Sequence, residues 1–294
     1  MLNGVMTALI TPFKDNKTDF KSLEILIEKH IAAGVSGFVI LGTTAETPAL
    51  TFAEKEEILK FATKVINKRV KIIAGVGSNS TQTTLSNIEM AVKYSPDMLL
   101  VVTPYYNKPN LSGMIAHYQA AAQAGVPIML YHIPGRTGQK LNIKFFDALL
   151  KEVPQIKAVK ESDYDIVHIT EMAAKFGGKR LEYVCGNDDL WPVFLGLGGK
   201  ALISAAGNSL APAFVKIHSL FMQGKTQEAM AVFSAAYPLI TGSFFEVNPT
   251  CSKYVLEKLN ICSSQVRLPL GPIAKETAEK LDAILAQTDR TLLI

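Results

Sequence analysis

The sequence is poor in cysteine and tryptophan, and it has no long uninterrupted apolar run. Its 294 residues include three cysteines and one tryptophan. Because Cys185, Cys251 and Cys262 are widely spaced and odd in number, a disulfide framework or a Cys-x-x-Cys motif is disfavoured, and we expect reduced, buried thiols. No apolar stretch reaches the length of a membrane span without a charge or a turn signal, so we expect no membrane partner.

An excess of charge of one sign is also missing. The chain has 30 Lys and Arg against 26 Asp and Glu, a net charge of +4. The densest basic groups, Lys68–Lys71 and Lys175–Arg180, fall at predicted helix ends or loops, where solvated cations are usual. This dispersal disfavours a nucleic-acid partner. Residues Met1–Gly4 lead directly into a strand pattern, without a charged leader and an apolar signal region, so we expect a cytoplasmic protein.

Short apolar runs alternate regularly with amphipathic segments. Four of the helical segments are Leu23–Ala33, Ala53–Ile66, Thr83–Lys93 and Met114–Ala124. The predicted strands are Val5–Ile10, Phe38–Leu41, Ile72–Val76, Met98–Val102, Ile128–His132, Ile156–Lys160, Tyr183–Cys185 and Ala201–Ile203. Eight β-then-α units indicate the α/β class with a parallel sheet, and the chain length favours a closed (β/α)₈ TIM barrel over an open sheet.

The strand pattern stops at about Lys225. The remaining segments Gln227–Phe244, Ser252–Leu259 and Lys275–Ala286 have helical patterns. We therefore predict a (β/α)₈ catalytic barrel over residues 1–224 and a C-terminal helical extension over residues 225–294.

Lys160 closes an apolar strand and is the first candidate catalytic residue. In a parallel barrel the active site lies at the carboxyl ends of the strands. Desolvation disfavours the charged form of an amine, so a lysine at this place can be nucleophilic near neutral pH and attack a carbonyl to form a Schiff base. The alternative is a strand-end lysine whose ammonium extends into water.

Other polar residues follow neighbouring strands and are predicted at the same rim. The Gly42–Thr44 turn can present N–H groups and hydroxyls to a carboxylate, or it can simply begin a helix. Tyr131 can act as a general acid or base beside Lys160, because the fifth and sixth strands adjoin; a satisfied core tyrosine is the alternative. Arg136 can clamp a carboxylate, although a surface arginine is usual in such a loop.

Two rival constellations are disfavoured. A barrel glycosidase needs two carboxylates that flank its sugar, but the end of the fourth strand carries only tyrosines. A metal-dependent aldolase needs clustered imidazoles, and His132 stands alone among the histidines at the predicted rim, so we expect no metal. The other histidines fall in predicted helical stretches: His30, His117, His168 and His218.

Together these motifs resemble the dihydrodipicolinate synthase family, part of the pyruvate-dependent class I aldolase superfamily that also holds N-acetylneuraminate lyase. The resemblance is carried by Gly42–Thr44, Pro104–Pro109, Pro134–Gly138 and Lys160–Glu161. It implies a carbon–oxygen lyase of diaminopimelate and lysine biosynthesis that condenses pyruvate with L-aspartate 4-semialdehyde. No cofactor is implied, because the iminium is the electron sink. The resemblance also implies a homotetramer, a dimer of dimers.

The resemblance assigns the chemistry to four residues. Lys160 forms the Schiff base with pyruvate. Tyr131, Thr43 and Tyr106 form a proton relay, in which Tyr106 reaches in from a neighbouring subunit.

The resemblance assigns substrate binding to five residues. Thr43 and Thr44 bind the pyruvate carboxylate. Arg136 recognises the carboxylate of aspartate semialdehyde, while Gly186 and Ile203 supply backbone contacts near the lysine.

The chain departs from the family pattern at several places. Ala45 replaces a common glycine, so that turn either does without a positive φ or is strained. His132 stands where asparagine is common, and Ser162–Asp165 replaces a loop of small residues. In the lysine-inhibitor site of regulated members, Phe52 and Lys55 stand where histidines occur and Thr83 where a glutamate would hold the effector's amine. We therefore expect weak or absent inhibition by lysine.

Two other functions remain open on the sequence. The first is another pyruvate-dependent aldolase, which would cleave N-acetylneuraminate or a 2-keto-3-deoxy sugar acid. The second is a non-catalytic barrel that binds a ligand and would trap no pyruvate adduct on Lys160.

Overall fold

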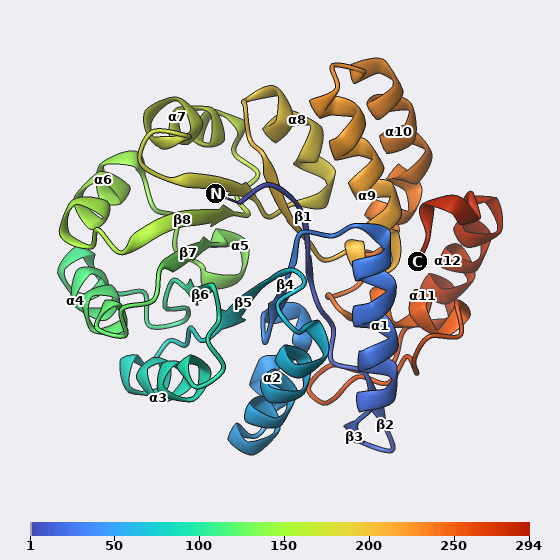
Figure 1. Ribbon diagram of the computed structural model, residues 1–294, viewed down its shortest axis with the longest axis horizontal. Helices are drawn as coiled ribbons and strands as arrows, with labels where there is room; N and C mark the ends of the chain where they lie inside the picture. The colour runs from blue at the N-terminus through green and yellow to red at the C-terminus, as the bar shows by residue number, and fades with distance from the viewer. Residues whose placement is uncertain (1) are drawn as a thin grey trace. The chain divides into compact units, whose positions relative to one another are not determined.

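Eight strands close into a parallel barrel, in the order β1-β10-β9-β8-β7-β6-β5-β4. The computed structural model describes residues 2–294, so Met1, where the predicted barrel segment begins, lies outside the described residues. The fold confirms the predicted (β/α)₈ barrel (Figure 1). Its strands are β1 (Gly4–Ala8), β4 (Gly37–Ile40), β5 (Lys71–Gly75), β6 (Met98–Val102), β7 (Ile128–His132), β8 (Ile156–Glu161), β9 (Glu182–Cys185) and β10 (Ala201–Ser204).

Helices follow the strands along the chain, and a small hairpin of β2 (Phe13–Lys14) and β3 (Lys17–Thr18) precedes the first of them. The helices up to residue 196 are α1 (Phe20–Ala33), α2 (Phe52–Ile66), α3 (Thr81–Val92), α4 (Leu111–Ala122), α5 (Pro134–Thr137), α6 (Ile143–Glu152), α7 (Ile166–Phe176) and α8 (Trp191–Gly196). Of the helices described within residues 2–294, none has both the length and the apolar character that a membrane span needs.

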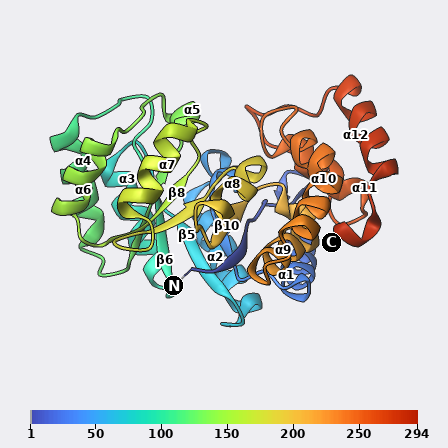
Figure 2. The same cartoon turned by 90° about the horizontal axis from the view of Figure 1, so that it is seen from above.

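The C-terminal part of the chain is helical, as predicted. After α9 (Gly207–Met222) come α10 (Thr226–Gly242), α11 (Thr250–Lys258) and α12 (Lys275–Gln287). Helix α12 packs on both α10 and α11, and the three are drawn together in Figure 2.

Local sequence explains where the elements begin and end. Helix α2 starts with a capping box, in which the Thr51 side chain accepts from the Glu54 amide and the Glu54 carboxylate accepts from the Thr51 amide. Helix α1 ends at Gly34, whose φ of 90° favours glycine. The predicted bounds of β6 and β7 are confirmed, whereas β8 continues one residue past Lys160, because Glu161 still pairs with its neighbours in the ladder.

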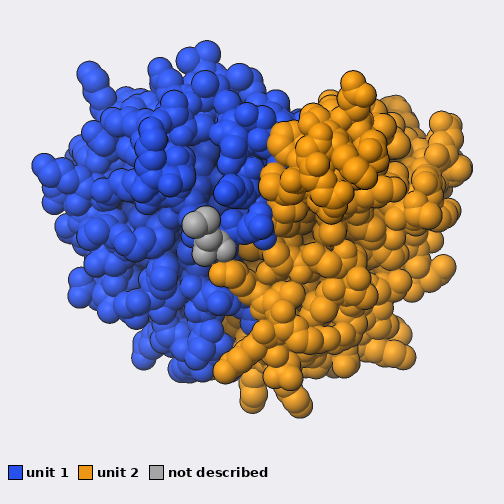
Figure 3. Space-filling model, turned by 45° about the horizontal axis from the view of Figure 1, so that its top comes forward, with its two compact units in different colours: residues 1–3, 72–202 blue, residues 4–71, 203–294 orange. Residues whose placement is uncertain are grey.

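The chain forms two compact units, coloured separately in Figure 3. One contains Leu2, Asn3 and Ile72–Leu202, and the other contains Gly4–Lys71 and Ile203–Ile294. The predicted domain boundary at residue 224 stays a prediction. The three cysteine thiols are free and buried.

Candidate active site

Lys160 and Tyr131 lie side by side on adjacent strands of the first unit. They are register partners in the β7–β8 ladder, and each is 6% exposed. The Lys160 Nζ lies 4.2 Å from the centroid of the Tyr131 ring. The structure therefore brings the predicted nucleophile against the predicted acid–base residue, as the neighbouring positions of these strands require.

Gly186 closes the other side of Lys160. A Cβ at position 186 would lie 3.0 Å from the Lys160 Cε and 2.7 Å from the Glu161 carbonyl oxygen, and it would overlap the Ser162 hydroxyl. The Gly186 amide also donates to that carbonyl over 2.8 Å. Glycine is needed here because the backbone approaches the lysine stem this closely.

Arg136 and Tyr106 follow strands β7 and β6 of the same unit. Arg136 lies in the short helix α5, which ends at Gly138 with a φ of 68°, and its side chain is exposed. Tyr106 follows β6, has a φ of 71° and is 89% exposed, unlike the buried Tyr131. Both side chains are thus free to meet a group from outside this chain.

Thr43, Thr44 and Ile203 lie in the second unit. Thr43 and Thr44 open a 3₁₀ turn directly after β4 and Gly42. Thr44 is 3% exposed, and its hydroxyl accepts a hydrogen bond of 2.9 Å from the Asn248 side chain. Ile203 is fully buried in β10.

Ala45 is compatible with this turn. The left-handed conformation falls on the next residue, Glu46, with a φ of 55°, and Ala45 itself has no positive φ. Replacement of the common glycine therefore causes no backbone strain at position 45.

A buried ion pair that sequence reasoning missed holds the end of this turn. Glu46 Oε1 lies 2.5 Å from Lys253 Nζ, with side chains 1% and 0% exposed. The Lys253 ammonium also donates to the Gln265 carbonyl over 2.8 Å and lies 4.0 Å from the Phe13 ring centroid. Burial lowers the pKa of Lys253, and the Glu46 carboxylate opposes this effect. The turn is thus anchored to the C-terminal helical part, whose Arg267 amide donates to Glu46 Oε2 over 2.8 Å.

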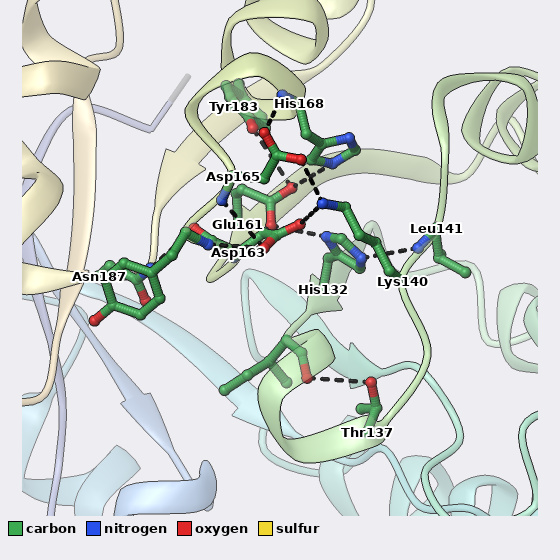
Figure 4. Close-up of polar contacts among 12 residues, drawn as sticks. His132, Thr137, Lys140, Leu141, Glu161, Asp163, Asp165, His168, Tyr183 and Asn187 are labelled. Atoms are coloured by element: carbon green, nitrogen blue, oxygen red, sulfur yellow. Dashed lines mark hydrogen bonds and ion pairs between the residues drawn. The ribbon is translucent and has the colours of Figure 1, made fainter.

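A second buried network surrounds Glu161, the residue after Lys160 (Figure 4). Its Oε1 accepts from His132 Nδ1 and from the Asp163 amide, each over 2.8 Å. Its Oε2 lies 3.4 Å from His168 Nε2 and accepts from the Tyr183 hydroxyl over 3.4 Å. Burial alone would raise the pKa of Glu161, but the hydrogen bonds from His132 and His168 outweigh it and lower the pKa to about 2.

The prediction that His132 stands alone at the rim is wrong. His132 is fully buried, and the ring of His168 from α7 lies 5.4 Å away between centroids. The two residues share Glu161 although they are far apart in sequence, which is why the sequence pattern did not group them.

His132, Asp163 and His168 each place a possible metal-ligand atom within 4.8 Å of the others. The hydrogen bonds disfavour a metal at this cluster. The Leu141 amide donates to His132 Nε2 over 3.1 Å, so the ring proton lies on Nδ1 and points to Glu161. Asp163 Oδ2 already faces the Lys140 ammonium at 3.1 Å. The cluster is therefore a carboxylate–imidazole hydrogen-bond group.

The fold and the site define a barrel enzyme with a buried lysine at the end of a strand. Comparison of the sequence and the structure with known proteins shows its family. The Dihydrodipicolinate synthetase family model matches residues 1–288. The 4-hydroxy-tetrahydrodipicolinate synthase of Methanospirillum hungatei is 35% identical, covering 98% of this chain and all of the relative. That of Methanocaldococcus jannaschii is 34% identical, covering 97% of this chain and 98% of the relative.

Solved structures agree. The 4-hydroxy-tetrahydrodipicolinate synthase of Methylacidiphilum fumariolicum SolV matches with a TM-score of 0.95 at 32% identity, covering 99% of this chain and 97% of that one. The chloride-inhibited dihydrodipicolinate synthase from Acinetobacter baumannii, complexed with pyruvate, matches with a TM-score of 0.93 at 32% identity. The match covers 98% of this chain and 99% of that one. The chain belongs to the dihydrodipicolinate synthetase family.

Proposed function

We propose that this protein is a 4-hydroxy-tetrahydrodipicolinate synthase, a Schiff-base-forming lyase of the diaminopimelate route to lysine. Its substrates are pyruvate and L-aspartate 4-semialdehyde. The observation that carries the proposal is the buried Lys160 amine against the Tyr131 ring, in a chain that belongs to this family over nearly its full length.

The reaction begins when the neutral Lys160 amine attacks the ketone carbon of pyruvate. Loss of water from the carbinolamine gives an iminium, and loss of a methyl proton gives an enamine whose carbon attacks the aldehyde of the second substrate. The amino group of that substrate then adds to the iminium carbon, which closes the ring and breaks the bond to Lys160. We assign proton transfer to and from the lysine to Tyr131, whose ring lies against the amine.

The remaining predicted residues supply binding and relay functions. Thr43 and Thr44 bind the pyruvate carboxylate through the hydroxyls and N–H groups of their turn, and Thr43 joins the relay. The exposed Arg136 guanidinium recognises the carboxylate of aspartate semialdehyde with its two-pronged fork. Gly186 and Ile203 offer backbone groups near the lysine.

We propose that the working form is a cytoplasmic homotetramer, arranged as a dimer of dimers. Tyr106 completes the relay of a neighbouring subunit, which its 89% exposure supports. A chain separated from its partner would then lack one member of the relay.

The test is the initial rate with pyruvate and aspartate semialdehyde, followed through the NADPH-dependent reductase that consumes the product. We expect a robust rate that is lost in Lys160→Ala. If the wild-type protein shows no rate but still traps pyruvate with borohydride, the acceptor is a different aldehyde, and the synthase proposal is wrong.

A further inference from the structure

Two pairs of residues share the ends of β7 and β8. Tyr131 is the register partner of Lys160, and the next residues, His132 and Glu161, are partners in turn. Because successive side chains of a strand point to opposite faces, the second pair lies behind the first. The pair behind contacts the surrounding helices, since the His132 ring meets Phe146 of α6 at 5.3 Å and His168 of α7 at 5.4 Å.

The Glu161 carboxylate joins four elements at this point. Its hydrogen bonds and close contacts reach β7 through His132, α7 through His168, β9 through Tyr183 and the following loop through the Asp163 amide. The side chain is fully buried, so none of these contacts is replaced by bulk water. Figure 4 shows the imidazoles and the phenol directed at the carboxylate.

We propose that Glu161, His132 and His168 form a positioning group that holds Lys160 against Tyr131. Glu161 acts through the strand that it shares with Lys160 and does not touch the substrate. The inference rests on the proposed roles of Lys160 and Tyr131 in Schiff-base chemistry.

The physical reason is the geometry that iminium formation needs. The bond between His132 and Glu161 joins β7 and β8 one residue beyond the reacting pair, so that the strands cannot separate or slip there without breaking a buried charged hydrogen bond. Misplacement of reacting groups by about 1 Å costs on the order of 100-fold in rate.

Glu161→Gln tests this role, because it keeps the shape of the side chain and removes its charge. Iminium formation from pyruvate is followed by quenching with borohydride at timed intervals and counting adducts by mass spectrometry, per folded molecule, over a range of pH. We expect the plateau rate to fall by about tenfold through lost positioning.

A second pair of variants keeps the test decisive if Glu161→Gln folds poorly. His132→Asn retains a donor for Glu161 at the position of Nδ1, whereas His132→Leu removes it. We expect the asparagine variant to keep a plateau within about threefold of the wild type and the leucine variant to lose about tenfold. The matched control is His117→Asn in α4, which removes an imidazole that is 3% exposed and bonded to Thr81, and should leave the plateau unchanged.

The outcomes separate the inference from the function. If Glu161→Gln only lowers the melting temperature and leaves the plateau rate of iminium formation as in the wild type, the positioning role is wrong. The same holds if both His132 variants react like the control. If the wild-type protein traps no pyruvate on Lys160, the proposed function fails first, and the inference fails with it.

Discussion

Replacing Lys253 by methionine should destabilise the protein more than any single surface change. The lysine is fully buried with Glu46, and its Nζ lies 2.5 Å from the carboxylate and 2.8 Å from the Gln265 carbonyl. Methionine is about as long as lysine and is apolar, so it fills the space of the lysine side chain. It leaves the Glu46 charge without its cation.

The expected loss follows from the cost of an uncompensated buried charge. Breaking a buried pair by removing one partner typically costs about 3–5 kcal/mol. Glu46 keeps one donor, the Arg267 amide at 2.8 Å, which places the expectation at the lower end of that range, about 3 kcal/mol. A second change, Glu46→Gln, removes the stranded charge and should restore about 1–2 kcal/mol in the double variant.

The assay is guanidinium denaturation followed by circular dichroism, at one fixed protein concentration. Lys258→Met in the same helix is the matched control, because Lys258 is 43% exposed and its pair with Asp282 lies at the surface. We expect the control to change the free energy of unfolding by less than about 1 kcal/mol. The reasoning is refuted if Lys253→Met is as stable as the control, or if the double variant is no better than Lys253→Met.

Three further predictions concern acid stability, substrate recognition and regulation. The folded-state pKa of Glu161, about 2, lies below the ordinary 4.5. Its contribution to the free energy of unfolding, about 3 kcal/mol, is therefore complete above pH 4.5 and lost as pH falls towards 2. When unfolding is measured over this pH range, Glu161→Gln should lack this loss of stability. Arg136→Ala should raise KM for aspartate semialdehyde at least about tenfold and leave pyruvate trapping unchanged, whereas equal loss in both assays would contradict its role. Millimolar lysine should leave the initial rate nearly unchanged, because Phe52, Lys55 and Thr83 do not offer the amine a carboxylate; strong inhibition would refute this.

Much of the fold was predictable because local pattern and global fold agree. The apolar runs Met98–Val102 and Ile128–His132 are buried strands with the predicted bounds. The alternation of strand and helix is sufficient to place Lys160 and Tyr131 at the same end of adjacent strands, because βα units in one parallel sheet repeat the same direction. The contact between these two residues could therefore be predicted without knowing how the loops fold.

The two buried charged networks were not predictable, for a common physical reason. Glu46 and Lys253 come from opposite ends of the chain, and His168 reaches Glu161 from a helix whose register the amphipathic pattern alone does not relate to the strand. A buried charge is costly unless it is paired, so a glutamate directly after an apolar strand was the signal in the sequence that Glu161 has partners. That signal does not say which residues they are.

The proposed Schiff-base chemistry depends most directly on a covalent bond between pyruvate and one lysine. The deciding measurement is peptide mapping by mass spectrometry after incubation with pyruvate and borohydride. We predict a single reduced adduct, on Lys160, that is absent in Lys160→Ala. No adduct, or an adduct that maps to another lysine, would contradict the assignment.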